Sequence, residues 1–383
     1  MSSVRTTIMD HFALLPDPRI DRAKRHSLMD ILVIALCASI CGVESFVDME
    51  MFGEAKLDWF STFLELPGGI PSHDTFARVF SRLDTQAFSE CFLSWIAAIH
   101  TKSQGEVIAI DGKTLRRSFD KASGQAALHM VSAWASNNNL VLGQVAVHEK
   151  SNEITAIPAL LKMLDVAGCI VTIDAMGTQK AIADQIQKQE ADYVLALKGN
   201  HPNLCADVET YFSRCINEQW RDAQDEPITH TLFKSRNKGH GRIDTRMCLA
   251  TECPTWVEGK EQWAGLRSIA LIEATRTSEG KTSVERRYFI SSLPPDAQQI
   301  AHAIRSHWGI ENKVHWILDM AFREDECRVR KDHAPANMAT LRHITLNLVK
   351  QENGGKKKSI RSKRLIAGWE HEYLWKILTG AKN

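Results

Sequence analysis

One stretch near the C-terminal end combines an apolar helical pattern with a carboxylate: Ile304-Arg305-Ser306-His307-Trp308-Gly309-Ile310-Glu311-Asn312-Lys313-Val314-His315-Trp316-Ile317-Leu318-Asp319. The helical spacing from Ile300 gives one stripe that is apolar except for two members: Ile304, Trp308, Glu311, His315, Leu318 and Phe322. The pattern predicts a helix over roughly Pro295 to Phe322 with Glu311 in its inward-facing row. Because an unpaired charge is costly to remove from water, Glu311 must find a basic partner, become protonated or hold a cation.

Two further acids follow apolar, partly β-branched runs. Val107–Ile110 leads into Asp111, and Ile170–Ile173 leads into Asp174. Each run is typical of a buried strand with a carboxylate at its C-terminal end, which is where α/β folds place chemistry beside a crevice. Three acids from two strands and one helix could converge on a divalent ion such as Mg²⁺, which prefers oxygen ligands. An ordinary salt bridge to a nearby Arg or Lys is the alternative explanation for Glu311.

The order of expected elements predicts an α/β fold. Three strands in a meander are expected at Val107–Asp111, His129–Ala135 and Val141–His148. They are followed in turn by a helix, a strand, a helix and a strand at Glu153–Leu164, Ile170–Asp174, Thr178–Gln189 and Tyr193–Leu197. This order is typical of a ribonuclease-H-like core, a mixed sheet flanked by helices.

Three blocks around these acids resemble a known family. They are Ala109–Thr114 (Ala-Ile-Asp-Gly-Lys-Thr), Ile173–Met176 (Ile-Asp-Ala-Met) and Trp308–Trp316 (Trp-Gly-Ile-Glu-Asn-Lys-Val-His-Trp). They resemble the acidic motifs of DDE transposases of bacterial insertion sequences, in particular the group of H-repeat-associated proteins linked to Rhs elements. The resemblance extends over nearly the whole chain, including Pro16–Arg19 and Gly69–Arg78.

The resemblance implies a transposase that cleaves and transfers DNA strands at the ends of an insertion sequence. Asp111, Asp174 and Glu311 would be its catalytic and metal-binding acids, holding Mg²⁺ or Mn²⁺, as two ions. The partners would be DNA, both terminal inverted repeats and target, and a second copy of the chain, since two ends must be brought together. From the acids alone we expect only metal-dependent nuclease chemistry. A hydrolytic nuclease and a non-catalytic DNA-binding remnant of a transposase therefore stay open as alternatives.

Basic and polar residues near the acids are candidates for DNA contacts. Lys113, Arg116 and Arg117 follow Asp111, and the resemblance supports Lys198 and Asn200, after the last strand, as site-lining residues. Arg242 and Arg246 lie on one face of an expected strand, where an exposed face laced by charge pairs is the alternative. The candidates beside Glu311 are Arg305, His307, Lys313 and His315. The wider superfamily shows Tyr, Arg and Lys where this chain has Ile304, His307 and Leu318, so the contacts beside the acid are not fixed by the resemblance.

The rest of the chain divides by pattern into three parts. Residues 1–104 are expected to be a helical domain, in which Ser72–Arg78 is either a helix-turn-helix with His73, Thr75 and Arg78 facing DNA or part of a plain helical bundle packed on the core. Residues 105–350 form the expected catalytic domain, with a β-rich insertion at about 205–290 and a helix over His333–Val349. Residues 351–383 carry Lys356–Lys358, Arg361, Lys363 and Arg364 and are expected to be a solvated basic tail with salt-sensitive affinity for DNA.

Composition indicates a soluble, non-secreted, cytoplasmic protein. The nine cysteines form no CxxC pair, and the longest apolar run, Ile31–Val43, is too short to span a bilayer. Net charge is +1, but residues 1–100 carry 8 basic and 13 acidic side chains, whereas residues 301–383 carry 16 and 9. A basic C-terminal part favours contact with a polyanion there. No GxSxG elbow and no glycine-rich phosphate loop is present, so serine hydrolase chemistry and ATP use are not indicated.

Overall fold

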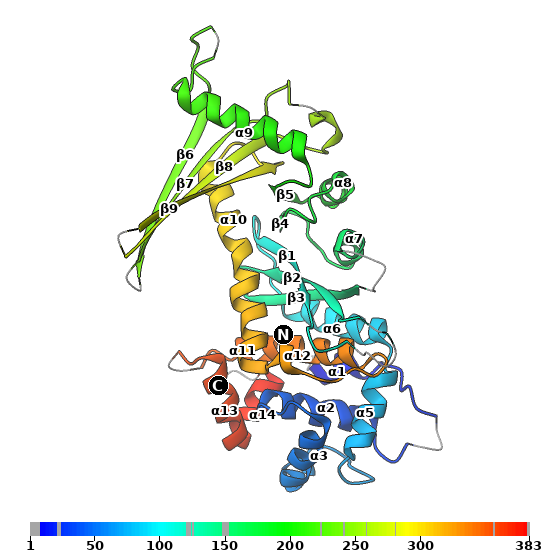
Figure 1. The fold of residues 1–383 in the computed structure, drawn as a ribbon. Coiled ribbons are helices and arrows are strands. Elements are labelled where there is room, and N and C mark those ends of the chain that lie inside the picture. The colour runs from blue at the N-terminus through cyan, green and yellow to red at the C-terminus, as the bar shows by residue number, and fades with distance from the viewer. Residues whose placement is uncertain are drawn as a thin grey trace, which may run out of the picture.

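The fold is built on one nine-stranded sheet with the strand order β3-β2-β1-β4-β5-β9-β8-β7-β6. The computed structural model describes residues 8–20, 24–119, 124, 126–147, 153–222, 224–239, 242–257, 259–279, 281–354 and 357–380. Figure 1 shows the sheet with helices beside it and a cluster of helices at one end. The expected class, a mixed sheet flanked by helices, is confirmed.

The first five strands form the core that the sequence predicts. The strands β1 (Val107–Thr114), β2 (His129–Ala135) and β3 (Leu140–Val147) are an antiparallel meander. β4 (Ile170–Ile173) and β5 (Asp192–Leu197) continue the sheet in parallel with β1, after the helices α7 (Glu153–Lys162) and α8 (Lys180–Lys188). This is the ribonuclease-H-like order. Val107 to Ile110 are fully buried, as their apolar character requires.

The insertion extends this same sheet. It opens with a helix that the sequence interpretation did not include, α9 (Pro202–Asn217). Four strands follow: β6 (His230–Gly239), β7 (Arg242–Glu252), β8 (Ser268–Ser278) and β9 (Lys281–Ser291), with a short 3-10 turn, η2 (Lys260–Gln262), between β7 and β8. β9 pairs antiparallel with β5, so the insertion and the core share a continuous set of backbone hydrogen bonds.

One long helix carries the opening stretch of sequence across the sheet. Asp296 caps it by accepting hydrogen bonds from the backbone N–H groups of Gln298 and Gln299. The helix comprises α10 (Ala297–Ile310), a π-helical turn η3 (Glu311–His315) and α11 (Trp316–Phe322). It contacts β1 and β4 in the core and β6 and β7 in the insertion (Figure 1). The expected helix is therefore confirmed, and it lies against both halves of the sheet.

The next helix, α12 (Ala334–Gln351), is buried over nearly its whole length and follows the short 3-10 turn η4 (Glu324–Glu326). Two of its asparagines form hydrogen bonds with backbone groups of other elements. Asn337 Nδ2 donates to the carbonyls of Phe80 and Leu83, each at 2.9 Å, and Asn347 Oδ1 accepts from the backbone N–H of Val141 at 2.9 Å. α12 thus joins the N-terminal helices to the outer strand of the core.

The N-terminal helices form a bundle. They are α1 (Ile8–Phe12), α2 (Leu28–Ile40), α3 (Phe46–Ala55), α4 (Leu57–Phe60), α5 (His73–Arg82) and α6 (Thr85–Ile99). The helix-turn-helix expectation for Ser72–Arg78 was wrong in its geometry, because that motif needs a turn of three or four residues whereas α4 ends at Phe60 and α5 begins at His73. His73 pairs with Glu50, its Nδ1 lying 2.5 Å from Oε2.

The C-terminal segment is folded in large part, contrary to the expected solvated tail. It contains α13 (Ile360–Trp369) and α14 (His371–Thr379). Lys363 and Arg364 are buried: Lys363 Nζ donates to the Val349 carbonyl at 3.0 Å, and Arg364 Nη2 donates to the Ser39 carbonyl at 2.9 Å. Both side chains are buried because they donate hydrogen bonds to carbonyl oxygens at the ends of other helices, a role that composition does not reveal. Lys356 lies outside the described residues.

No helix within the described ranges is both long enough and apolar enough to cross a membrane.

Candidate active site

Asp111 and Asp174 are neighbours because of strand register. Ile110 of β1 pairs with Ile173 of β4 in parallel, so the next residue of each strand reaches the same edge of the sheet. Asp111 Oδ1 accepts the backbone N–H of Gly112 at 2.9 Å, and its side chain is 18% exposed. Asp174 Oδ1 accepts the backbone N–H groups of Met176 at 3.1 Å and Gly177 at 3.2 Å. Each carboxylate is thereby oriented by backbone N–H groups that follow it in the chain, within β1 for Asp111 and in the loop after β4 for Asp174.

Glu311 is exposed, so the expectation of an inward-facing carboxylate was wrong. The π-helical turn begins at this residue, and its wider turn shifts the phase of the helix. Ile310, Val314, Leu318 and Phe322 continue the buried face instead. Glu311 lines a cavity of about 680 Å³, named here the acid cavity, together with Asp174, Lys198 and His307. π-helical turns occur frequently at functional sites.

The charge of Asp111 is incompletely compensated. Burial, together with the nearby carboxylates of Asp174, Glu311 and Glu153, raises its pKa to about 7 against the opposing effect of the Gly112 hydrogen bond. The donors are all carboxylate oxygens, the type that Mg²⁺ and Mn²⁺ prefer. In the ranges that the structure describes, however, no group of three or more His, Cys, Asp and Glu side chains is close enough to hold one ion. The three acids fit a divalent cation in chemistry and in electrostatics but do not form a closed coordination shell.

Two histidines of the long helix lie against the acid site. His315 Nδ1 is 3.5 Å from Asp111 Oδ2, and burial lowers the His315 pKa to about 4, with the cations around it adding to the effect. His307 Nδ1 lies 3.1 Å from Thr172 Oγ1, and burial lowers its pKa as well. Both imidazoles are therefore neutral at pH 7 and support neighbouring side chains.

Lys113, two residues after Asp111, is already engaged by carboxylates. Its Nζ lies 2.5 Å from Asp319 Oδ1 and 2.7 Å from Glu324 Oε2. Burial opposes the charge of Lys113, but these acids outweigh burial and raise its pKa. Arg116, on the loop after β1, pairs with Asp325, and the exposed Arg117 accepts a hydrogen bond at its carbonyl from Arg330. Of this basic cluster, only the two arginines have side chains open to solvent.

Lys198 and Asn200 follow β5 and come close to the acids. Lys198 is exposed and lines the acid cavity with Asp174 and Glu311. The amide of Asn200 donates a hydrogen bond to the carbonyl of Ala175, so the two loops that follow β4 and β5 are tied together. Among the candidates, Lys198 and His307 share a cavity with two of the acids, and of these two Lys198 is the exposed one.

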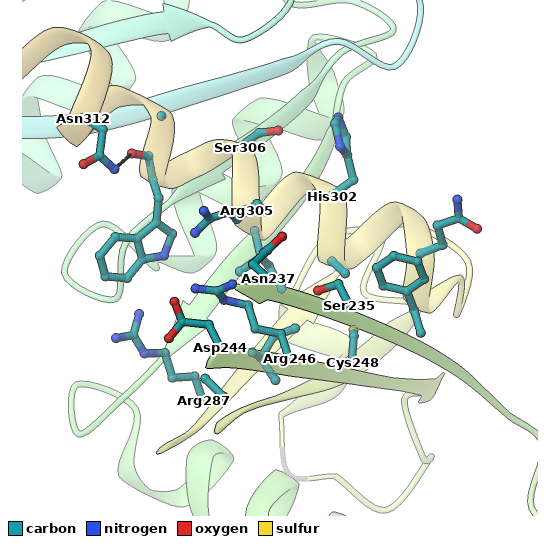
Figure 2. A pocket seen from close by; sticks show the side chains of 18 of the residues that line it. Ser235, Asn237, Asp244, Arg246, Cys248, Arg287, His302, Arg305, Ser306 and Asn312 are labelled. Atoms are coloured by element: carbon teal, nitrogen blue, oxygen red, sulfur yellow. Dashed lines mark hydrogen bonds between the residues drawn. The ribbon is translucent and has the colours of Figure 1, made fainter. Parts of the chain in front are cut away.

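A second cavity of about 1650 Å³ lies between α10 and the insertion strands (Figure 2). We name it the arginine cavity after its basic lining: Lys238, Arg242, Arg246, Arg276, Arg287, Arg305 and Lys313. Both cavities are lined by Glu285, Arg287, Ile304 and Trp308, so they adjoin at the Arg287 guanidinium, which lies 4.8 Å from the Trp308 ring. Lys313 is at the cavity margin, with its Nζ 2.8 Å from Asn139 Oδ1.

The sequence interpretation missed Arg276 and Arg287. Arg276 stands directly opposite Asp244 in the pairing of β8 with β7, and its Nε lies 2.8 Å from Asp244 Oδ1. Arg242 Nε is 3.3 Å from the other carboxylate oxygen of Asp244. A basic residue opposite Asp244 could have been identified only from the register between β7 and β8, which the sequence alone does not define.

Comparison with known proteins gives consistent matches over both parts of the chain. A family model described as DDE_Tnp_1-associated matches residues 9–96, and one described as Transposase DDE domain matches residues 102–348. YhhI, an H repeat-associated protein of Escherichia coli K12, is 38% identical over 379 residues, covering 98% of each chain. A protein from the dhlA 3′ region of Xanthobacter autotrophicus is 43% identical over 291 residues, covering 74% of this chain and 94% of its own. The piggyBac transposase in a synaptic complex with hairpin DNA aligns with a TM-score of 0.44 at 11% identity, covering 94% of this chain and 74% of that chain.

Proposed function

This chain belongs to the family of transposases with a DDE domain, and we propose that it cleaves and transfers DNA strands at the ends of a bacterial insertion sequence. The observation that carries the proposal is the register of β1 and β4, which brings Asp111 beside Asp174 at one sheet edge, next to the helix that bears Glu311. The carboxylates of Asp174 and Glu311 help to raise the pKa of Asp111, which supports a site that lacks positive charge.

Asp111, Asp174 and Glu311 would hold two divalent ions, Mg²⁺ or Mn²⁺. When bound, such ions lower the pKa of an attacking water or 3′-hydroxyl and stabilise the leaving oxygen. The protein itself would orient the carboxylates that bind these ions. The Gly112 backbone N–H and the neutral His315 hold the Asp111 carboxylate, while the loop N–H groups after β4 hold Asp174.

DNA would enter along the basic residues around the acids. Lys198 is placed to meet the phosphate next to the reacting bond, with Asn200 supporting its loop. Arg116 and Arg117 on one side, and Arg242, Arg246, Arg305 and Lys313 on the other, would contact the backbone farther away. Lys113, His307 and His315 would contribute by holding the site together. Two copies of the chain would act on two DNA ends, in the cytoplasm.

A cleavage assay tests this proposal. A labelled duplex with the inverted repeats that flank the gene is incubated with Mn²⁺ or Mg²⁺ and with the parent protein, Glu311→Gln, or Glu372→Gln. Glu372 is an exposed acid on α14 and serves as the matched control. We expect metal-dependent cleavage by the parent and by Glu372→Gln, and none by Glu311→Gln, with gel-shift affinity retained in all three.

Each other outcome has a definite meaning. If target DNA is supplied and the ends are cleaved but not joined to it, the protein is a hydrolytic nuclease and not a transposase. Binding by the parent without cleavage under any metal would favour the non-catalytic remnant. Equal cleavage by the parent and Glu311→Gln would remove Glu311 from the catalytic set.

A further inference from the structure

Two arginines of the arginine cavity differ from the others in forming no ion pair with any residue that the structure describes. Arg246 of β7 and Arg305 of α10 come from elements that pack on one another, and Figure 2 shows both reaching into the space between helix and sheet. Arg242 and Arg276 are paired with Asp244, and Arg287 with Glu285 at 2.8 Å. Within the part of the chain that the structure describes, neither Arg246 nor Arg305 forms an ion pair.

Placing these two guanidinium groups together is unfavourable without an anion. Arg246 is half-buried, and burial, followed by the nearby charge of Arg305, lowers its pKa. Asp244 offsets this only in part, because its two carboxylate oxygens pair with Arg276 and Arg242. Glu285 pairs with Arg287, and Asp296 caps α10. Guanidinium groups bind phosphate oxygens through paired hydrogen bonds of matched geometry. A phosphate between the two would remove their repulsion.

We propose that Arg246 and Arg305 form a clamp for one backbone phosphate of the DNA strand that passes from the acid cavity into the arginine cavity. The proposal rests on the proposed function for the identity of the strand and deepens it by assigning one phosphate to one pair of residues. Arg242 and Arg276 are not part of the clamp, because each already pairs with Asp244.

The position of the clamp relative to the reacting bond follows from the helix. Arg305 precedes Glu311, the first residue after α10, by six residues, a distance of about 9 Å along the helix axis at about 1.5 Å per residue. A DNA strand advances about 3.4 Å per nucleotide. The clamped phosphate is therefore two or three nucleotides from the bond that is cleaved.

A scan with uncharged phosphates tests the clamp. Duplexes carrying a single methylphosphonate at each of the positions within about six nucleotides of the element end, on either strand, are bound to the parent protein in gel shifts. We expect a loss of affinity of roughly ten- to a hundredfold at two or three nucleotides on one strand, since a charged hydrogen-bonded pair is lost. The Arg246→Ala/Arg305→Ala double variant is expected to bind unmodified DNA more weakly than the parent does. A methylphosphonate at that position should not lower the affinity of the double variant any further.

Two further variants separate the clamp from general charge. Arg305→Lys keeps the charge but not the forked geometry, and is expected to restore part of the affinity lost in Arg305→Ala. Arg276→Ala is the control: it lines the same cavity but is paired with Asp244, and its scan should keep the penalty of the parent. Melting temperatures of all variants show whether each is folded.

The clamp and the proposed catalysis fail in different ways. A parent that cleaves DNA but gives a scan without a position-specific penalty, or a penalty that survives in the double variant, overturns the clamp and leaves the catalysis. A parent that never cleaves but shows an arginine-dependent penalty retains the clamp and loses the catalysis. No DNA binding by the folded parent overturns both.

Discussion

The imidazole of His315 faces the carboxylate of Asp111, with 3.5 Å between His315 Nδ1 and Asp111 Oδ2. This contact joins the helix that carries Glu311 to the strand that carries the first acid. His315 is neutral at pH 7, because burial lowers its pKa to about 4, so it can hold Asp111 without cancelling the negative charge that a cation needs.

His315→Ala should therefore lower cleavage by roughly ten- to a hundredfold, the range typical when a side chain supporting a metal ligand is removed. Gel-shift affinity for DNA should change little, because a buried neutral imidazole offers no charge to a phosphate. His315→Asn retains a hydrogen-bonding group and should recover part of the rate. A loss of affinity equal to the loss of rate would instead assign His315 to DNA contact.

Asp111→Asn should stabilise the fold in the absence of divalent metal. The folded-state pKa of about 7 exceeds the ordinary value of 3.8, so the folded protein keeps a proton that the unfolded chain releases. The resulting cost to the parent is small near pH 4, rises towards pH 7 and then stays constant at about 4 kcal/mol at most. Thermal unfolding with EDTA should give a larger difference in Tm at pH 8 than at pH 5.

Divalent metal provides the control for this variant. Mn²⁺ should raise the Tm of the parent, because binding to the folded state alone is stabilising, and should raise that of Asp111→Asn less. The same difference in Tm at both pH values would contradict the raised pKa of Asp111.

The extent to which the sequence predicts the site differs from one acid to the next. Asp111 and Asp174 follow buried, partly β-branched runs, and the local pattern was sufficient to predict both strands. Asp174 directly follows β4, as expected, whereas β1 continues past Asp111 to Thr114 in its pairing with β2. Glu311 was placed on the right helix but on the wrong face. The phase of that helix depends on the π-helical turn that begins at Glu311, after which Val314 and Leu318 are buried, whereas the predicted stripe assumed a regular α-helix.

The partners of charged residues were beyond prediction for a different reason. Lys113 meets Asp319 and Glu324 across chain separations of 206 and 211 residues, and nothing local distinguishes it from a lysine on a solvated turn. The burial of Lys363 and Arg364 has the same origin, because the carbonyls that they bind belong to the ends of other helices.

Lys113→Met should destabilise the protein by on the order of 3 kcal/mol, because removing one member of a buried ion pair leaves the other without compensation. Glu324, which is 2% exposed, would keep only Arg342 at 3.7 Å as a partner. Urea unfolding measures the loss, and Lys113→Met with Glu324→Gln should recover part of it. Lys188→Met is the control, since Lys188 forms an exposed pair with Asp184 on α8 and should lose about 0.5 kcal/mol or less.

The final prediction concerns Gly309, two residues before Glu311. A Cβ at this position would overlap the six-membered ring of Trp134, which is buried in β2 and 1% exposed. Alanine favours helix by about 1 kcal/mol over glycine. Overlap with a close-packed ring costs about 1–3 kcal/mol, and a buried tryptophan with neighbours on the sheet has little room to move. Gly309→Ala should therefore lower stability despite the gain in helix propensity.

The effect on cleavage should exceed the effect on stability, because the easiest relief is to push α10 away from β2 and so move Glu311 away from the two aspartates. Gly309→Ala combined with Trp134→Phe should regain cleavage as space is made. Gly368→Ala in α13 is the matched control: its Cβ would lie 3.9 Å from the Cys41 carbonyl oxygen, an ordinary contact, so propensity alone should make it neutral or stabilising. If Gly309→Ala behaves like Gly368→Ala in Tm and in cleavage rate, the close approach of α10 to Trp134 does not position Glu311.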